Sequence, residues 1–199
     1  MNVPKLLEAG RVPRHLLPWG KGQKFNASVQ SGTAFMSHVC MAGLNRVDFP
    51  MKGYGGHTVM DDSDVELSRH LDAVRHATGN VLKTGLGFGC FIRMCLTKTD
   101  VKHIDVVEIN GNIIDHFGAE FNDDPRVTIH HCDAFDFDPS GRYWDFAWHD
   151  IYTEGNEGLA TAHVRLIRRY LKHCAVQGAW QLPRETRKMV QNKYPGVLI

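Results

Sequence analysis

The chain has 199 residues and a mass of 22.5 kDa, with 23 Lys and Arg residues against 22 Asp and Glu residues. This length predicts one domain, or one domain with a modest appendage, and 43% hydrophobic residues suffice for a core and exclude a disordered chain. The formal charge of +1 argues against a broad nucleic-acid-binding surface, and no apolar run approaches the roughly 18 residues of a membrane span. We therefore expect neither a nucleic acid nor a membrane as partner.

The N-terminal residues and the cysteines indicate the compartment. Pro4, Glu8, Arg11 and Pro13 interrupt the apolar residues of the first 19 positions, so the continuous apolar stretch of a secretory signal is missing. The five cysteines are scattered and form no C-x-x-C pair. Both features predict a cytoplasmic protein with free thiols.

A run of potential metal ligands occurs at His130-His131-Cys132-Asp133. Adjacent residues on a strand point to opposite faces, so these side chains do not converge on one ion without a kink. The sequence also contains neither H-x-x-x-H nor H-E-x-x-H. We expect no metal site.

The sequence changes character near Met60, which divides the chain into two units. Residues 1–60 are rich in Gly, Pro and other turn-forming residues, which predicts an N-terminal segment of short strands and loops. We interpret this segment as a lid or acceptor site, because functional loops commonly lie above the edge of a rigid sheet. Residues 61–199 have regular periodicity and form the second unit.

Helical and strand patterns alternate in the second unit. Asp62 or Ser63 caps a helix that ends at Gly79-Asn80. The following elements are a strand at 81–84, a helix around 91–95, a strand at 104–109, a helix at 113–121 and strands at 127–130 and 144–148. After Tyr152 we expect a helix at 159–174, a strand at 179–182, a helix at 185–192 and a strand at 197–199.

This alternation predicts the fold class. Right-handed crossovers between the strands give an α/β, Rossmann-like doubly wound, mostly parallel sheet with helices on both faces. Ligands of such sheets bind at the carboxyl ends of the strands. The terminal strand at 197–199 leaves an apolar edge for a second subunit, which makes a homodimer possible.

A glycine-rich turn, Gly85-Leu86-Gly87-Phe88-Gly89, separates the strand at 81–84 from the next helix. The dinucleotide fingerprint requires a third glycine at position 90, where the chain has Cys90. The P-loop interpretation fails because no G-K-[ST] follows. The remaining G-x-G-x-G pattern lets the backbone approach a bulky nucleoside closely, and the alternative is a tight turn without a ligand.

Two acidic residues follow neighbouring strands. Glu108 lies 23 residues after Gly85, near the roughly 20 expected for an acid that binds ribose hydroxyls; the alternative is a solvated strand end. Asp133, followed by Ala134, comes after the next strand, where a carboxylate can bond an adenine amino group. The alternative for Asp133 is a common loop residue.

These motifs resemble those of a known family. In chain order they are Gly85-Leu86-Gly87-Phe88-Gly89, Val106-Val107-Glu108-Ile109-Asn110, Asp124-Pro125-Arg126-Val127, Asp133-Ala134 and Trp144-Asp145-Phe146-Ala147-Trp148-His149-Asp150-Ile151-Tyr152. This series resembles the motifs of class I S-adenosylmethionine-dependent methyltransferases, and within them the spermidine-synthase-like branch, over roughly residues 55 to 155.

The resemblance implies S-adenosylmethionine as cofactor and assigns roles to single residues. The cofactor-binding residues it implies are Gly85, Gly87 and Gly89 for the methionine part, Glu108 at the ribose, Asp133 and Ala134 at the adenine, and also Leu86, Ile109 and Asp150. Asp150 falls where aminopropyltransferases keep an acid that prepares the substrate amine. Those enzymes carry an Asp-Ser/Thr-Asp-Pro run there, and this chain has Asp150-Ile151-Tyr152-Thr153 instead.

Asp150 and Tyr152 are the candidate catalytic residues. Asp150 follows a strand and is the best-placed general base, with an N-cap as the alternative. Tyr152 orders the acceptor or flanks the sulfonium with its ring, with a core role as the alternative. Tyr54, Asp61 and Asp62 are candidates for acceptor binding, although Asp61 and Asp62 also suit a helix start.

The sequence thus favours an S-adenosylmethionine-dependent methyltransferase with a small-molecule acceptor. The alternatives are an aminopropyltransferase that uses decarboxylated S-adenosylmethionine and a non-catalytic S-adenosylmethionine-binding protein. A nucleic-acid methyltransferase is disfavoured because Asp150-Ile151-Tyr152 lacks the two prolines of the Asp-Pro-Pro-Tyr motif. The basic stripe formed by Arg165, Arg168, Arg169 and Lys172 is interpreted as a solvated helix face.

Overall fold

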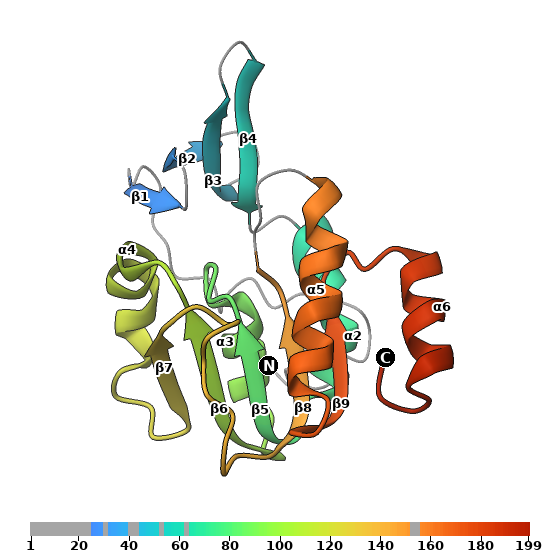
Figure 1. Cartoon of the computed structure of the whole chain (residues 1–199). Helices are drawn as coiled ribbons and strands as arrows, with labels where there is room; N and C mark the ends of the chain where they lie inside the picture. The colour runs from blue at the N-terminus through green and yellow to red at the C-terminus, as the bar shows by residue number, and fades with distance from the viewer. Residues whose placement is uncertain (1–24, 30–31, 40–43, 52–53, 62–63, 152–155) are drawn as a thin grey trace.

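The computed structural model describes residues 25–29, 32–39, 44–51, 54–61, 64–151 and 156–199. Side chains are described from Arg69 onward, apart from positions 112, 116 and 152–159. The described strands form two sheets, one antiparallel with the order β1-β2-β3-β4 and one with the order β7-β6-β5-β8-β9 (Figure 1).

The antiparallel sheet comes from the Gly-rich N-terminal part of the chain. Its strands are β1 (Phe25–Val29), β2 (Gly32–Val39), β3 (Leu44–Met51) and β4 (Tyr54–Asp61). Each strand pairs with its neighbour in the sequence, as short connections favour. In Figure 1 this sheet lies beyond the carboxyl ends of the strands of the other sheet.

The second sheet is parallel throughout. Its strands are β5 (Gly79–Thr84), β6 (Val101–Glu108), β7 (Val127–His131), β8 (Trp144–His149) and β9 (Cys174–Ala179). Numbered along the chain, the order is 3-2-1-4-5, which matches the first five strands of the doubly wound nucleotide-binding arrangement. The α/β, Rossmann-like fold predicted from the sequence is confirmed.

Helices cover both faces of the parallel sheet (Figure 1). They are α2 (Asp64–His76), α3 (Cys90–Leu96), α5 (Asn156–Tyr170) and α6 (Arg184–Lys193). Val81 of β5 belongs to the core under α2 and α3, whereas its neighbour Leu82 belongs to the core under α5. The two-residue period of a strand therefore supplies both cores from one segment.

The predicted regular helix at 113–121 is wrong. The segment consists of a single turn α4 (Gly111–Ile113), a π-helical turn η2 (Ile114–Gly118) and a 3-10 turn η3 (Ala119–Phe121). A Cβ atom at Gly118 would lie 2.9 Å from Ile129 Cδ1 of β7, so the backbone approaches the sheet here more closely than another residue would permit. Glycine is also a weak helix former. The apolar periodicity used for the prediction reflects neither the close approach of Gly118 to the sheet nor this low propensity.

The predicted boundary after α5 is also wrong. The helix ends at Tyr170, the next strand is β9 at Cys174–Ala179, and residues 180–181 form a turn in which Gln181 has φ 48°. Gln177 is buried in β9 because its side-chain amide is satisfied by His149 Nε2 at 2.9 Å and the Ile167 carbonyl at 3.1 Å. Gln177 and Gly178 interrupt the apolar pattern of this segment, so the sequence did not predict a strand here.

The C-terminus departs from the prediction as well. The predicted strand at 197–199 is reduced to a single parallel bridge between Gln177 and Leu198.

Among the described helices, none combines the length and the hydrophobicity that a membrane span requires.

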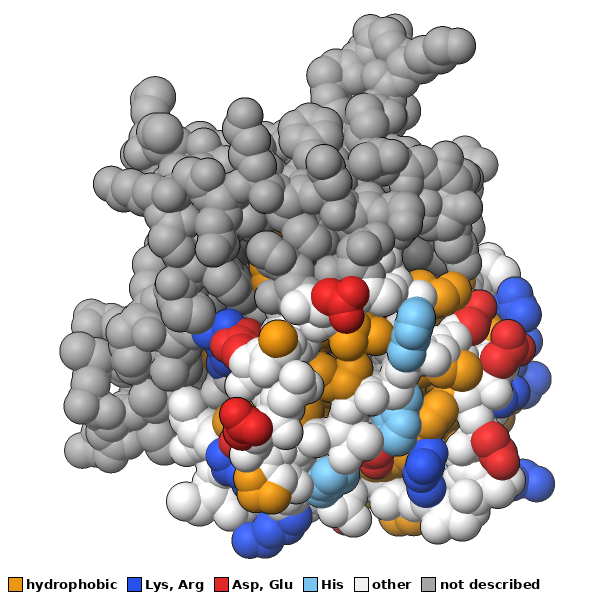
Figure 2. All heavy atoms as spheres, turned by 90° about the vertical axis from the view of Figure 1, so that its left-hand side faces the viewer, with side chains coloured by type: hydrophobic (Ala, Val, Ile, Leu, Met, Phe, Trp, Pro, Cys, Tyr) orange, Lys and Arg blue, Asp and Glu red, His pale blue; other side chains and the backbone are white. Residues whose placement is uncertain are grey.

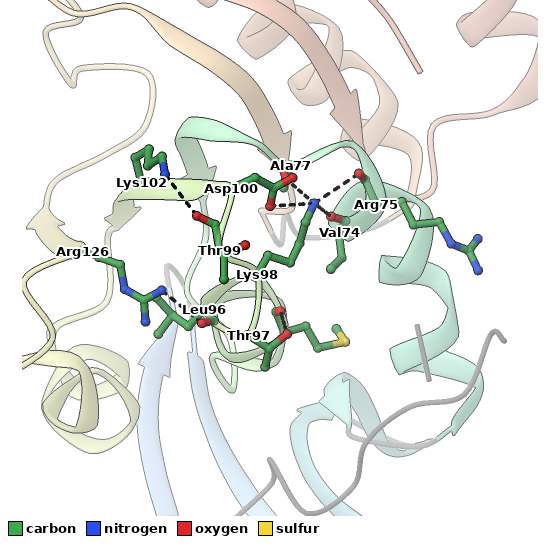
Figure 3. A network of polar contacts seen from close by, with 11 residues as sticks. Val74, Arg75, Ala77, Leu96, Thr97, Lys98, Thr99, Asp100, Lys102 and Arg126 are labelled. Atoms are coloured by element: carbon green, nitrogen blue, oxygen red, sulfur yellow. Dashed lines mark hydrogen bonds and ion pairs between the residues drawn. The ribbon is translucent and has the colours of Figure 1, made fainter. Parts of the chain in front are cut away.

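Lys98 fixes the end of α2 at the amino edge of the parallel sheet (Figure 3). Its ammonium donates hydrogen bonds to the carbonyls of Val74 at 2.9 Å, Arg75 at 3.2 Å and Ala77, and it forms an ion pair with Asp100 at 3.8 Å. The last carbonyls of a helix lack partners within the helix, so a lysine at this point stabilises the helix end.

Candidate functional site

The glycine turn connects β5 to α3 through backbone conformations that other residues rarely adopt. Gly85, Gly87 and Gly89 have φ angles of 83°, 57° and 72°. A Cβ atom at Gly85 would overlap the carbonyl oxygen of Asp150, and one at Gly89 would lie 2.7 Å from the Phe121 ring. Glycine is therefore required at both ends of the turn by close contacts as well as by φ.

Glu108 joins this turn to the carboxyl end of β6. Its Oε2 accepts a hydrogen bond from the Leu86 backbone N–H at 2.7 Å, and its Oε1 accepts one from the Asn110 N–H at 2.9 Å. The residue is buried, with 6% of its surface exposed, and this burial raises the pKa of its carboxyl, while the two backbone donors lessen the rise. Each carboxylate oxygen keeps a second lone pair, so the group can still accept from vicinal hydroxyls.

The next two predicted residues differ in exposure and in bonding. Ile109, directly after Glu108, is 45% exposed and thus offers an apolar surface beside the turn. Asp133 accepts a hydrogen bond from the Phe135 N–H at 2.8 Å, which closes a local Asx turn after β7. The Cys132 N–H bonds the Glu108 carbonyl at 3.0 Å, so the ends of β6 and β7 lie side by side.

Ala134 is buried, and its position is fixed by a helix on the same side of the sheet. Its carbonyl accepts a hydrogen bond from the Tyr170 O–H of α5 at 2.7 Å.

The surface over β7 and α4 is mixed in character (Figure 2). Its described side chains include acidic, basic, histidine and hydrophobic groups side by side.

Asp150 follows β8 and lies against the start of the glycine turn. Its N–H donates to the Thr84 carbonyl at 3.0 Å, and its Oδ2 lies 3.0 Å from the Lys83 ammonium. The side chain of Asp150 is 27% exposed, whereas that of Lys83 is 2% exposed. Burial alone would raise the pKa of Asp150, but the Lys83 charge, the His70 charge and the hydrogen bond from Lys83 together outweigh it and hold the pKa below its ordinary value, so the carboxylate is ionised at neutral pH.

The sequence interpretation missed Lys83. A lysine between Leu82 and Thr84, in a strand that is otherwise buried, was the available signal. Buried lysines are rare unless a partner satisfies them. The partner is 67 residues away in the sequence, so strand order was needed to find it.

His149 faces the other side of the sheet from Asp150, as alternation along β8 predicts. Its ring stacks on Tyr170 at a centroid distance of 5.6 Å, and its Nε2 lies 2.9 Å from Gln177 Oε1. Burial lowers its pKa to about 3, so it is a neutral structural residue at physiological pH.

The remaining predicted site residues are only partly covered by the structure. Tyr152 and Asp62 lie outside the described residues. Tyr54 and Asp61 are the first and last residues of β4, and their side chains are not described. The roles predicted for these four residues stay predictions.

An open hollow lies on the surface of α5. It is lined by Phe135, Arg165, Arg168 and Arg169 and has a volume of about 480 Å³. The Arg165 guanidinium lies 4.5 Å from the centre of the Phe135 ring. Three residues of the basic stripe predicted from the sequence therefore surround this hollow.

The described cysteines and possible metal ligands bear on two of the predictions. Cys95, Cys132 and Cys174 are free thiols. Within the described ranges no group of His, Cys, Asp and Glu side chains is arranged to hold a metal ion.

Comparisons with known proteins add structural neighbours to these observations. No protein-family model matches the sequence, and no curated protein matches it. The matching solved structures include a Pyrococcus horikoshii protein provisionally named an RNA methyltransferase, with a TM-score of 0.48 and 14% identity over 66% of this chain and 65% of that one.

Two further neighbours represent the two types of transferase. Spermidine synthase from Thermotoga maritima matches with a TM-score of 0.46 and 16% identity, over 62% of this chain and 45% of that one. The N-methyltransferase NodS from Bradyrhizobium japonicum, solved with S-adenosyl-L-homocysteine, matches with a TM-score of 0.46 and 19% identity, over 58% of this chain and 59% of that one. The chain thus spans less than two thirds of each of these proteins.

The neighbours are class I methyltransferases and spermidine synthases, as the motif resemblance predicted. At these identities and TM-scores they decide neither activity nor acceptor. The features that bear on function are therefore the strand order, the glycine turn and the acids beside it.

Proposed function

We propose that the chain is an S-adenosylmethionine-dependent methyltransferase that acts on a small-molecule acceptor. The observation that carries this proposal is the bond between the Leu86 N–H and Glu108, which sets an acidic side chain beside the glycine turn. In a doubly wound sheet this is the position at which a nucleoside ribose binds. The exposed Ile109 supports the assignment because it offers an apolar surface to a flat base.

The described residues fit this cofactor. Glu108 accepts hydrogen bonds from the ribose hydroxyls, Ile109 covers one side of the adenine, and Asp133 and Ala134 lie at its edge. The positions without a Cβ at Gly85 and Gly87 leave the backbone accessible to the methionine part. When bound, S-adenosylmethionine supplies an electrophilic methyl group on its sulfonium sulfur.

Asp150 is the proposed general base. The Lys83 ammonium keeps its carboxylate ionised, and its partial exposure leaves it accessible to an acceptor. It therefore orients an acceptor N–H or O–H and takes its proton as the nucleophile attacks. Tyr152, Tyr54, Asp61 and Asp62 complete the acceptor side of the proposal, and free thiols fit a cytoplasmic location.

An aminopropyltransferase is the second candidate, and the acid at Asp150 favours it. Such an enzyme would use decarboxylated S-adenosylmethionine, whose tail carries an ammonium without a carboxylate. The two candidates share the adenosine site and differ in the tail that the site must accept.

Calorimetric titration with S-adenosylhomocysteine tests the adenosine site in both candidates. Glu108→Ala should weaken binding by about 1.5–3 kcal/mol, because hydrogen bonds to a charged group are lost. Glu185→Ala, which removes an exposed carboxylate of α6, is the matched control and should bind as the wild type does. Equal affinities of a folded Glu108→Ala variant and the wild type would remove Glu108 from the ribose site.

A further inference from the structure

The ammonium of Lys83 has more hydrogen-bond donors than the described residues have acceptors for it. It carries three N–H groups. Two acceptors among the described residues lie within reach, Asp150 Oδ2 at 3.0 Å and the Thr84 carbonyl at 3.2 Å. Because the side chain is 2% exposed, the third N–H is withdrawn from solvent, and a buried donor without an acceptor costs free energy.

The position of Lys83 indicates which ligand would satisfy that donor. Its ammonium contacts the last residue of β5 and the first residue after β8, and Gly85 follows the former in the chain and lies against the latter. The Gly85 backbone is so close to the Asp150 carbonyl that no Cβ fits between them. The lysine thus lies at the beginning of the glycine turn, the part assigned above to the methionine tail of the cofactor.

We propose that Lys83 is the specificity-determining residue for the cofactor tail: its third N–H binds the tail carboxylate of S-adenosylmethionine. This inference rests on the proposed function and decides between its two candidates. Asp150 holds the ammonium at the turn, and the tail adds both a carboxylate and an ammonium, so the filled site gains no net charge from the tail.

Decarboxylated S-adenosylmethionine meets a different environment at the same site. It has no carboxylate to accept the third N–H, and its tail ends in a second positive charge beside the Lys83 ammonium. Like charges a few ångströms apart repel strongly where little water screens them. Lys83 therefore selects against the aminopropyl donor and favours methyl transfer.

A purely structural ion pair between Lys83 and Asp150 is the competing explanation. A structural role changes the affinity for every adenosyl ligand by the same factor. The proposed role changes the ratio between ligands that carry a tail carboxylate and ligands that lack it. The ratio of the affinities for S-adenosylmethionine and for its decarboxylated form therefore distinguishes the two roles.

The test is calorimetry with three probes, namely S-adenosylmethionine, its decarboxylated form and 5′-methylthioadenosine, which lacks the tail. The wild type should bind S-adenosylmethionine at least about tenfold more tightly than the decarboxylated form. Lys83→Met should weaken S-adenosylmethionine by about 10- to 100-fold and leave 5′-methylthioadenosine within about twofold. Lys102→Met, in an exposed position near the start of β6, is the matched control and should leave all three affinities unchanged.

Two results overturn the inference alone: a wild type that binds the decarboxylated form as tightly as S-adenosylmethionine, and a Lys83→Met variant that loses affinity equally for all probes. If none of the probes binds the wild type at millimolar concentration, the proposed function fails as well. Binding of 5′-methylthioadenosine separates these cases, because it reports the adenosine site without the tail.

Removal of one member of an ion pair can also prevent folding. The double variant Lys83→Met/Asp150→Asn removes both charges together and gives a second measurement of the same ratio. It should lose the preference for S-adenosylmethionine, and a double variant that keeps a tenfold preference overturns the inference. Should neither variant fold, the wild-type ratio decides, and a ratio below about threefold counts against the role of Lys83.

Discussion

Two lysines at opposite edges of the parallel sheet show how differently the two edges are built. At the amino edge, the ammonium of Lys98 has three carbonyl acceptors and the carboxylate of Asp100 (Figure 3). At the carboxyl edge, the ammonium of Lys83 has two acceptors among the described residues, although it is the more deeply buried of the two. Lys98 has an acceptor for each of its donors, whereas the described residues offer Lys83 acceptors for two of its three.

Other side chains at these edges repeat the contrast. Arg126, at the amino edge, donates to the Leu96 carbonyl at 3.1 Å and pairs with Asp124 at 3.1 Å. At the carboxyl edge, Ile109 leaves almost half of its apolar surface exposed, and Asp150 leaves about a quarter of its side chain exposed. The carboxyl edge thus exposes an apolar surface beside the glycine turn, whereas Arg126 and Asp124 at the amino edge are paired with each other.

The glycine turn gives the largest expected effect on stability. Gly85→Ala should lower the free energy of unfolding by about 3 kcal/mol, because alanine is strained at φ 83° and its Cβ overlaps the Asp150 carbonyl. Gly141→Ala is the matched control, since φ is 74° there and no atom lies within 4 Å of the added Cβ. Its expected cost is about 1–2 kcal/mol.

Chemical denaturation of both glycine variants measures this difference. Equal losses would mean that the close approach of Asp150 to the turn adds nothing beyond the φ penalty. The contact of the Asp150 carbonyl with Gly85 would then not explain why the turn requires glycine.

Lys98→Met should have a smaller effect on stability and none on ligands. The change removes the donors that cap the carbonyls at the end of α2, at a cost of about 1–2 kcal/mol. Denaturation measures the loss, and calorimetry with S-adenosylhomocysteine should give the wild-type affinity. A weakened ligand affinity in a folded Lys98→Met variant would erase the distinction between the two edges.

The periodicity of the sequence was sufficient for the fold class and for the order of elements from α2 to β8. Strand-helix alternation produced the parallel sheet, and spacing alone led from Gly85 to Glu108. β9 was concealed because Gln177 is satisfied by His149 and by Ile167, which lie in other elements. The segment 111–121 was misassigned because the approach of Gly118 to β7 is a tertiary effect.

The candidate site was predictable only where chemistry depends on residues close in the sequence. Asp150 was identified, but the charge that keeps it ionised was not, since Lys83 becomes its neighbour through the pairing of β5 with β8. The same pairing sets the ammonium of Lys83 beside the start of the turn. The sequence alone does not show which donors and acceptors lie near Lys83 in the folded chain.

The central claim is that an adenosyl ligand binds at the carboxyl edge beside Glu108, and amide NMR with S-adenosylhomocysteine tests it most directly. The amides of Leu86 and Asn110, which donate to Glu108, should shift on titration, while those of Lys98 and Asp100 at the other edge should not. Unchanged Leu86 and Asn110 signals at millimolar ligand, or shifts confined to the amino edge, would contradict the account.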